Sequence, residues 1–210
     1  MPMKPGKAPI LNRYTSLPIA FDVLVQRRLT LLSPETWEDR NDAYYLERYR
    51  EEKKLKTLVA MCFSARGETF HHWKVFSSGS SGVCIEFDKS RLLKAFPISS
   101  GFCYKDIQYR FVETVNKQRP EVDMWPFLKR KAFKDEGEFR IIYEDTAVHE
   151  HTKSVKIDLG TINKVTLSPW LPDAVAESIQ ALIKTIKGCE RLSVNRSTLI
   201  DNSGWKKAIE

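Results

Sequence analysis

The sequence has few cysteines, and no two of them stand at short spacing. The four present among 210 residues are Cys62, Cys84, Cys103 and Cys189, each in an apolar, strand-like context. A zinc site of the usual CxxC spacing is therefore not indicated, and buried thiols in a reducing compartment are expected. We predict a cytoplasmic location and no metal site.

Long apolar runs are also missing. No stretch approaches the roughly 20 apolar residues that a membrane-spanning helix requires. Residues 1–9 are basic and rich in proline but have no apolar signal-peptide core, so they are expected to form a flexible lead-in. No membrane partner is predicted.

Several motifs that would identify an enzyme class are absent. The sequence has no GxxxxGK[ST] phosphate loop, no GxGxxG and no HExxH. His71 and His72 are adjacent, so on a helix they would point about 100° apart, and neither has an i, i+4 partner for a metal. A P-loop nucleotidase, a dinucleotide-binding fold and a zinc protease are not indicated.

The composition is that of a globular protein with a basic surface. Hydrophobic residues make up 42% and aromatics 11%, and the net charge is +7, from 34 basic and 27 acidic residues. This length suits one domain, and the charge favours polyanions such as nucleic acid or phosphate-bearing ligands. We predict one catalytic-type domain over residues 10–210.

The hydrophobic pattern alternates between strands and helices. Strands are expected at 10–14, 29–32, 57–64, 82–87, 101–105, 155–159, 165–167 and 192–194. Helices are expected at 18–26, after the loop 37–42, and at 68–76, 108–117, 124–133 and 172–187. Ser16 and Asp88 are expected to cap helices, and the last helix has Val175, Ile179, Leu182, Ile183 and Ile186 on one face. Strand, helix and strand over about 30 residues near the end fit a parallel crossover. The fold class is predicted as α+β.

One stretch, residues 135–143, combines paired acids with a buried strand. If it is extended, Glu136, Glu138 and Arg140 share one face while Phe139, Ile141 and Tyr143 share the other. The two carboxylates would then lie about 7 Å apart, because a strand rises about 3.4 Å per residue. The paired acids could be a chemical site or an ordinary surface ion pair, and this stretch alone does not decide between them.

Polar residues also stand at the ends of other expected strands. They are Arg13, Tyr14 and Thr15 in the first strand, Arg40 in a charged loop, and Ser64 after a nearly continuous apolar strand. Trp73 and Phe76 follow on a short helix. Individually, each has an ordinary structural role available to it.

Taken in order, these pieces resemble a widespread bacterial family of unknown function. The shared motifs are Arg13-Tyr14, Leu-x-Leu-x-Ser-Pro at 29–34, Asn41-Asp42, Cys62-Phe63-Ser64, Trp73 with Phe76, Gly-Val-Cys-Ile-x-Phe at 82–87, and Glu-x-Glu-aromatic-Arg at 136–140. The likeness runs from Arg13 to Ser197. It departs from the family at Phe76, where tyrosine is common, and after Asp42, where proline is usual.

More loosely, the order of Arg13, Ser64 and the Glu136–Glu138 pair resembles the Arg–Ser–Glu arrangement of the ADP-ribosyltransferase superfamily. This resemblance implies a split, mixed β-sheet flanked by helices, with NAD as substrate. In that superfamily the arginine holds an NAD phosphate or ribose, the serine steadies the nicotinamide ribose, and the last glutamate does the chemistry.

The resemblance assigns roles to residues of this chain. Glu138 would be the catalytic carboxylate and Glu136 its helper on the acceptor side, while Arg140 would anchor the acidic pair. The NAD-binding residues would be Arg13, Tyr14, Thr15, Arg40, Ser64, Trp73 and Phe76. Of these, Arg13 or Arg40 would pair with the pyrophosphate, and Trp73 or Tyr14 would stack on the nicotinamide.

The acceptor is expected to be nucleic acid, with RNA favoured, or protein. Lys129, Arg130 and Lys134 precede the acidic strand and could attract phosphates. The implied function is a mono-ADP-ribosyltransferase of toxin or phage-defence type, with an antitoxin as possible regulator. Two alternatives stay open: a non-catalytic nucleic-acid- or protein-binding module, and a nuclease using Asp39, Asp42, Glu136 and Glu138 around a metal.

Overall fold

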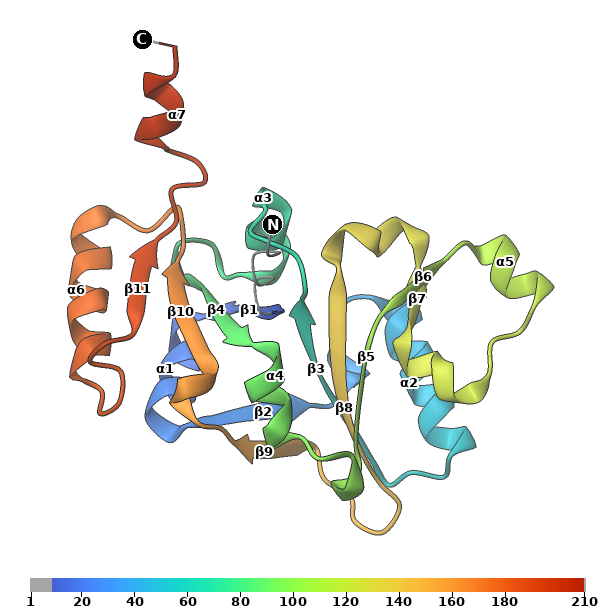
Figure 1. Cartoon of the computed structure of the whole chain (residues 1–210). Helices are drawn as coiled ribbons and strands as arrows, with labels where there is room; N and C mark the ends of the chain where they lie inside the picture. The colour runs from blue at the N-terminus through green and yellow to red at the C-terminus, as the bar shows by residue number, and fades with distance from the viewer. Residues whose placement is uncertain (1–8, 210) are drawn as a thin grey trace, which may run out of the picture. The chain divides into compact units, whose positions relative to one another are not determined.

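The computed structural model describes residues 9–209, which form two compact units built from segments that are distant in sequence. Unit 1 contains residues 9–28, 67–92 and 157–209, and unit 2 contains residues 29–66 and 93–156 (Figure 1). Apart from Pro9, the lead-in expected over residues 1–9 lies outside the described residues. Each unit contains β-strands and helices.

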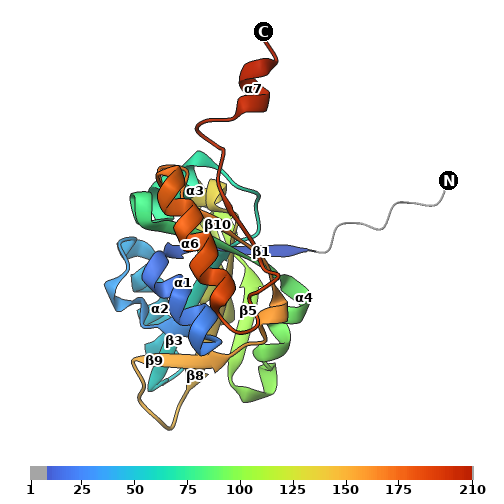
Figure 2. The same cartoon turned by 90° about the vertical axis from the view of Figure 1, so that its left-hand side faces the viewer.

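The sheet of unit 1 has the order β11-β10-β4-β1. β1 (Ile10–Ser16) pairs antiparallel with β4 (Gly82–Asp88), so that Tyr14 lies opposite Cys84. β4 in turn pairs antiparallel with β10 (Ile162–Leu167), and β10 pairs in parallel with β11 (Ser193–Arg196). The helix α6 (Asp173–Thr185) connects these last two strands and lies beside β11, which confirms the predicted parallel crossover (Figures 1 and 2).

The helices of unit 1 follow the sequence pattern with two corrections. The first is at α1 (Leu17–Gln26): Ser16 holds its N-cap position, but its side chain makes no capping hydrogen bond. The second is at α6: Val175 and Leu182, expected on the buried face, are 44% and 54% exposed, because Ala176 and Ile183 are the buried positions of that helix. The Asp88 cap is confirmed, since its Oδ1 accepts from the Arg91 backbone N–H at 2.9 Å at the start of α4 (Lys89–Leu92). The remaining helices are α3 (Phe70–Phe76) and α7 (Ser203–Lys207), the latter extending away from the sheet.

The sheet of unit 2 has the order β5-β8-β3-β2-β9. β3 (Thr57–Ser64) and β8 (Glu138–Asp145) form a continuous antiparallel ladder, and β5 (Phe102–Asp106) pairs antiparallel with the other edge of β8. Both β3 and β8 are almost wholly buried, as their apolar sequences predicted. β2 (Arg28–Leu32), which enters the unit at Leu29, and β9 (Thr152–Lys156) complete the sheet; β9 lies three residues before its predicted start.

The segment between β5 and β8 differs from the prediction. The helix expected over 108–117 begins as β6 (Gln108–Arg110), and only α5 (Val112–Lys117) is helical. The helix expected over 124–133 is wrong: the 3₁₀ turn Val122–Phe127 contains Pro126 and is followed by β7 (Leu128–Arg130), which pairs in parallel with β6. Proline inside a helix removes a hydrogen-bond donor and clashes with the preceding turn, so this segment does not continue as an α-helix.

The core of unit 2 lies between its sheet and α2 (Arg40–Glu52). The buried members of this cluster are Leu46, Tyr49, Leu55, Leu58, Ala60, Ile107, Trp125, Phe127 and Ile142. In unit 1, Tyr14, Trp73 and Cys84 form a smaller cluster, with Trp170 packed against it. These cores hold the strand ends that carry the candidate site residues.

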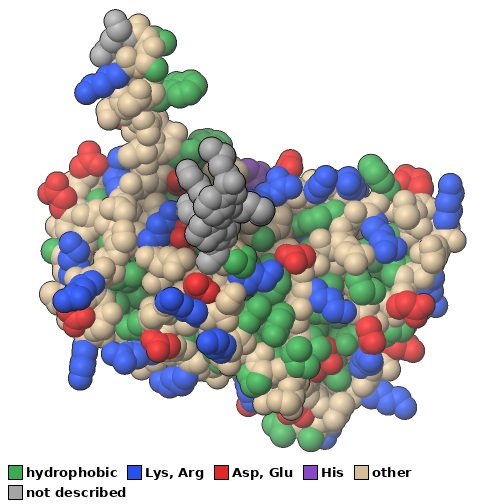
Figure 3. Space-filling model, in the orientation of Figure 1, with side chains coloured by type: hydrophobic (Ala, Val, Ile, Leu, Met, Phe, Trp, Pro, Cys, Tyr) green, Lys and Arg blue, Asp and Glu red, His purple; other side chains and the backbone are tan. Residues whose placement is uncertain are grey.

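The predicted α+β class, with mixed β-structure flanked by helices, is confirmed. Among residues 9–209, no helix has the length and apolar character needed to cross a membrane. On the face in view in Figure 3, Lys and Arg side chains are interspersed with Asp and Glu, so the positive charge does not gather into one block there.

Candidate active site in unit 2

Ser64 and Glu138 lie opposite each other where two central strands meet. β3 ends at Ser64 and β8 begins at Glu138, and the antiparallel register places these two residues as direct partners. The Ser64 hydroxyl donates to the Glu136 carbonyl at 2.8 Å, so it fixes the backbone that leads into Glu138. Two motifs more than 70 residues apart in the sequence therefore converge on one point.

Gly137 separates the two glutamates by a turn rather than by a strand step. The 3₁₀ turn Lys131–Glu136 ends at Gly137, which has a φ of +53° in the left-handed region that favours glycine. A Cβ at this position would collide with the side chain of Arg66. The expectation that Glu136, Glu138 and Arg140 share one strand face is thus wrong for Glu136 and correct for the other two. The turn nonetheless brings both carboxylates to the same cation.

Five side chains form what we call the charged cluster: Asp42, Lys129, Glu136, Glu138 and Arg140. Arg140 is at its centre and is fully buried. Its Nη1 and Nη2 donate to Asp42 at 2.8 and 2.6 Å, and its Nε donates to Glu138 Oε1 at 2.7 Å. Nη1 also donates to the Pro126 carbonyl at 2.8 Å, and the guanidinium lies 4.9 Å from the Trp37 ring centre. Arg140 therefore anchors Glu138, as predicted, but its second acidic partner is Asp42 and not Glu136, which pairs with Lys129.

Lys129 closes the cluster from the side of β7. Its Nζ lies 2.5 Å from Glu136 Oε2, 3.2 Å from Glu138 Oε2 and 3.8 Å from Asp42 Oδ2. The lysine side chain is only 9% exposed, and its ammonium also lies 5.0 Å from the Phe133 ring centre. Its predicted contact with nucleic acid would have to compete with these carboxylates. Arg130 and Lys134, predicted with it, are exposed.

The charges and burial of the cluster shift the pKa values of Glu136 and Glu138 in opposite directions. Burial disfavours the charged form of both, but Arg140 and Lys129 outweigh it at Glu138 and lower its pKa to about 2. At Glu136, burial prevails over the attraction of Lys129, and the pKa is raised. Glu138 is thus fully ionised at neutral pH, while Glu136 is the better proton acceptor. This asymmetry is typical of paired catalytic carboxylates.

Neighbouring residues hold the cluster in place, and the sequence pointed to few of them. The Glu138 backbone N–H donates to the Tyr109 hydroxyl at 2.8 Å. Asp42 follows Asp39, the N-cap of α2, whose Oδ1 accepts from the Asn41 and Asp42 backbone N–H groups. Asp42 belongs to the Asn41-Asp42 motif and to the four acids of the nuclease alternative, but nothing in the sequence indicates its pairing with Arg140 or points to Tyr109. Arg40, predicted to bind NAD, lies in a separate pocket with Glu47 and Arg50.

Apart from Arg40 and Ser64, the predicted NAD-binding residues lie in unit 1. Trp73 is fully buried and donates through Nε1 to Glu68 at 2.6 Å, while Glu68 also accepts from the Ser197 hydroxyl. Tyr14 is 7% exposed, stacks on His72 at 5.2 Å and meets the edge of Trp73 at 5.2 Å. Their buried rings do not support the predicted stacking on nicotinamide.

The remaining three NAD-binding candidates keep some exposure. Arg13 and Thr15 are half-buried on β1, and Phe76, at the end of α3, is 39% exposed. Phe76 contacts the rings of His71 and His72 at 6.2 and 6.0 Å. Its hydrocarbon ring supplies no hydroxyl.

The acidic residues of unit 2 are not arranged as a metal site. Within residues 9–209, no group of three or more His, Cys, Asp or Glu side chains is placed to hold a metal ion. Lys129 and Arg140 occupy the space between the carboxylates, and Asp39 caps a helix instead of joining them. The predicted nuclease centre of four acids is therefore not formed.

Comparisons with known proteins gave structural neighbours only. No family model and no curated protein matches the sequence. The chain is similar to solved structures of Thermus sp. 2.9 DarT. The structure of DarT in complex with ADP-ribosylated ssDNA matches with a TM-score of 0.48 and 10% sequence identity, and the match covers 94% of this chain and 98% of that chain. For the complex with NAD+ the TM-score is 0.47 at 9% identity, over 92% and 98%. At this level of similarity the neighbours assign no role to any residue, and the functional case depends on the site itself.

Proposed function

We propose that the protein is an NAD-dependent mono-ADP-ribosyltransferase with Glu138 as its catalytic carboxylate. The observation that carries the proposal is the pairing of Ser64 with Glu138 across β3 and β8. In the Arg–Ser–Glu arrangement that the motif order resembles, the serine steadies the neighbouring strand. The register of β3 and β8 supports this role for Ser64, because it pairs Ser64 directly with Glu138.

The charge of the cluster suits the chemistry. Three carboxylates share two cations, which leaves a net charge of −1 when all are ionised. Cleavage of the bond between nicotinamide and ribose develops positive charge on the sugar, as in glycoside hydrolysis. An ionised Glu138, whose position is fixed by Arg140, would stabilise that charge.

Glu136 then acts on the acceptor. With its raised pKa and its place one turn before Glu138, it can accept the proton of the attacking nucleophile. The Glu138 side chain is 5% exposed, and its Oε2 faces Lys129. Contact between Glu138 and a ribose therefore requires the Lys129 ammonium to move away from Oε2. The position of Lys129 would then control access of the substrate to Glu138.

The acceptor we propose is nucleic acid, with RNA or single-stranded DNA preferred to protein, because Arg130 and Lys134 are exposed on the segment that leads to Glu138. Within unit 2, Ser64 remains the proposed contact to NAD beside Glu138, while Arg13, Thr15, Arg40 and Phe76 stay predictions from the sequence. The family resemblance supports a toxin or phage-defence role in the bacterial cytoplasm, under the control of an antitoxin.

Glu138→Gln tests the proposal, with Glu144→Gln as the matched control. Glu144 lies on the same strand, is half-buried and bonds the Tyr49 hydroxyl. The proteins are incubated with NAD labelled in the adenylate half, together with RNA, single-stranded DNA or a protein lysate. We expect the wild type to transfer label and Glu138→Gln to lose about 100-fold or more of the transfer rate. Glu144→Gln should stay close to wild type.

Folding is checked separately because Glu138 is buried. Circular dichroism and binding of NAD by calorimetry show whether Glu138→Gln keeps its structure and its ground-state affinity. A folded Glu138→Gln with unchanged turnover would overturn the assignment. Binding of nucleic acid by the wild type with no transfer to any acceptor would favour the binding-module alternative.

A further inference from the structure

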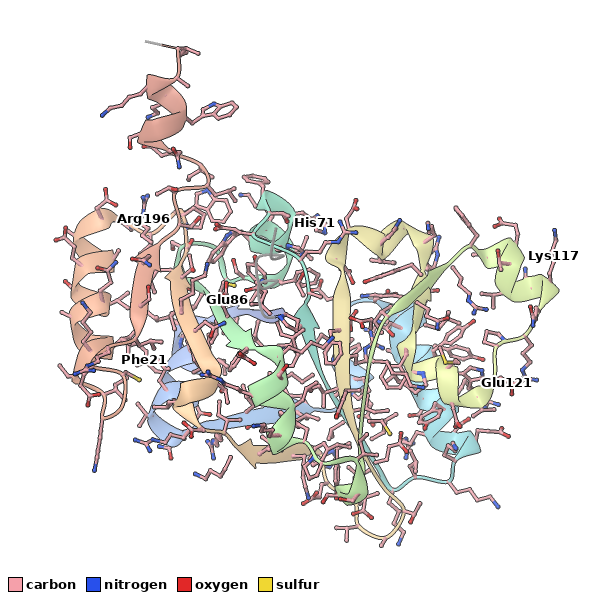
Figure 4. All side chains as sticks on the ribbon, viewed as in Figure 1. Phe21, His71, Glu86, Lys117, Glu121 and Arg196 are labelled. Atoms are coloured by element: carbon pink, nitrogen blue, oxygen red, sulfur yellow. The ribbon has the colours of Figure 1, made fainter. Side chains whose placement is uncertain are left out.

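A pocket on unit 2 adjoins the charged cluster. It has a volume of about 210 Å³ and lies between the start of α2, the strands β6 and β7, and α5. In Figure 4, α5 is found by Lys117, the labelled last residue of that helix. Asp42 and Lys129 belong both to the pocket lining and to the cluster. An occupant would therefore lie against the outer side of the proposed site.

The pocket lining combines an apolar slot with neutral amides, next to the carboxylates of Asp39 and Asp42 at the start of α2. Tyr45, Val112, Val115 and Leu128 supply a ring and aliphatic side chains, and Asn41 and Asn116 supply amide donors and acceptors. The volume is below the range of about 300–1,000 Å³ typical of sites for drug-sized ligands, so it suits one planar heterocycle. Aromatic and aliphatic walls with amides at the edge are how single-stranded bases are held.

Two arginines of this lining lie side by side without acidic partners. The parallel register of β6 and β7 places Arg110 opposite Arg130. Arg110 donates to the Gln108 amide oxygen at 3.0 Å, and in the part of the chain that the structure describes neither guanidinium forms an ion pair. Like charges at paired positions repel one another. A bound phosphate would relieve that repulsion, and its oxygens match the fork of a guanidinium.

We propose that this pocket binds one base of a single-stranded nucleic acid, with Arg110 and Arg130 on the adjoining phosphates. The inference deepens the proposed function, on which it rests for its biological meaning, by naming the acceptor and the surface that selects it. The base lies in the slot of Tyr45, Val112 and Leu128. Asn116 reads its edge. A duplex, whose bases are stacked and paired, cannot fill the slot.

Fluorescence anisotropy with labelled oligonucleotides tests the pocket, in the absence of NAD and with the full chain. The probes are 12-nucleotide dT, dA, U and A strands and a 12-base-pair duplex. Val112→Trp fills the slot without changing charge, and since Val112 is 49% exposed the variant should fold. Val175→Trp, at a 44% exposed position of α6, is the matched control. We expect Val112→Trp to weaken binding of single strands about tenfold, the order of one stacked base, and the control to bind like wild type.

The charge is tested by the double variant Arg110→Gln, Arg130→Gln, with Arg48→Gln as control. Arg48 is an exposed arginine of α2 that pairs with Glu51. Loss of two phosphate contacts should reduce the slope of log K against log salt by about 1.4 for single strands, and the control should not change it. Preference for the U and A strands over dT and dA would identify RNA as the source, through its 2′-hydroxyls, and the reverse preference would identify DNA.

Three outcomes would overturn the assignment: binding by Val112→Trp within twofold of wild type, equal weakening of single strands and duplex, or no binding of any oligonucleotide by the wild type. The wild type's transfer of labelled ADP-ribose from NAD separates this failure from that of the proposed function. If transfer occurs but Val112→Trp binds normally, only the pocket is wrong. If strands bind through the pocket and no NAD is consumed, only the transferase assignment fails.

Discussion

Arg140 and Asp42, 98 residues apart in the sequence, are joined by two parallel N–H···O bonds with almost no solvent access to either side chain. Asp42→Leu takes two charge-assisted hydrogen bonds from Arg140 and leaves it with Glu138, whereas Arg140→Met leaves both the Asp42 and the Glu138 carboxylates without their guanidinium partner. We expect Asp42→Leu and Arg140→Met each to lower the free energy of unfolding by about 3–5 kcal/mol, and the double variant to cost less than the sum. Urea denaturation of the two single variants and the double variant measures the coupling.

The exposed pair of Arg48 with Glu51 is the control for this cycle. Arg48→Ala should cost less than about 1 kcal/mol, because exposed ion pairs contribute little. Additive effects at Asp42 and Arg140 would contradict a tight buried pair.

Lys129→Met should destabilise the protein in a pH-dependent way. The low pKa of Glu138, about 2, means that this group stabilises the fold above its unfolded pKa of about 4.5 and loses that contribution as the pH falls towards 2. Without Lys129, the pKa of Glu138 rises, and the already raised pKa of Glu136 rises further. The cost of the substitution should therefore be largest at pH 7 and smaller at pH 5, where protonation relieves the repulsion between the carboxylates. Unfolding in urea at the two pH values measures this difference.

Lys184→Met, at an exposed position of α6, serves as the control and should show no such dependence. A cost for Lys129→Met that is the same at both pH values would show that its ammonium does not neutralise the glutamates.

Gly137→Ala tests the turn that brings Glu136 and Glu138 together. Gly137 has a φ of +53°, and a methyl group there would collide with Arg66. We expect a loss of about 1–2 kcal/mol in unfolding free energy and reduced NAD cleavage per folded molecule, since the spacing of the carboxylates would change. Gly67→Ala is the matched control, because no atom lies within 4 Å of its added Cβ and its backbone is not left-handed. If Gly137→Ala and Gly67→Ala changed stability and NAD cleavage equally, the left-handed turn at Gly137 would not be needed to position the two glutamates.

Trp73→Phe distinguishes a core residue from a nicotinamide-stacking residue. The indole N–H bonds Glu68 in a fully buried position, so its loss should cost about 1.5–3 kcal/mol of stability. The KM for NAD of the folded variant should be unchanged. Phe76→Leu, at a 39% exposed ring, should show the opposite pattern, with little loss of stability and a raised KM. A raised KM for Trp73→Phe would restore its predicted contact with NAD.

The sequence predicted the strands that carry the site better than the segment that surrounds it. β3 is almost entirely apolar, and its limits at Thr57 and Ser64 coincide with the prediction, because a strand buried on both faces leaves an unambiguous pattern. The parallel crossover of β10, α6 and β11 was also predictable from its spacing. The segment from Gln108 to Glu136 was not, since short strands and 3₁₀ turns have no period long enough to detect.

The candidate site could be predicted in part. Glu138, Ser64 and Arg140 follow from the order of the motifs, but Lys129 is predicted to bind nucleic acid because its sequence neighbours are basic. Only the fold of β7 turns its side chain towards the glutamates. Asp42 is part of a motif, yet its partner Arg140 is 98 residues away in the sequence, so no local pattern predicts that the two side chains pair.

The interleaving of the two units along the chain bears on the order in which they can form during synthesis. All strands of the unit 2 sheet have been synthesised once Lys156 is made, whereas β1 of unit 1 must wait for β10 and β11, which end at Arg196. Chains grow from the N-terminus at about 5–20 residues per second, so β1 remains without its full sheet for several seconds. During that interval the newborn chain contains every strand of unit 2 but only part of the sheet of unit 1. The order of synthesis thus delays completion of the unit 1 sheet relative to that of unit 2.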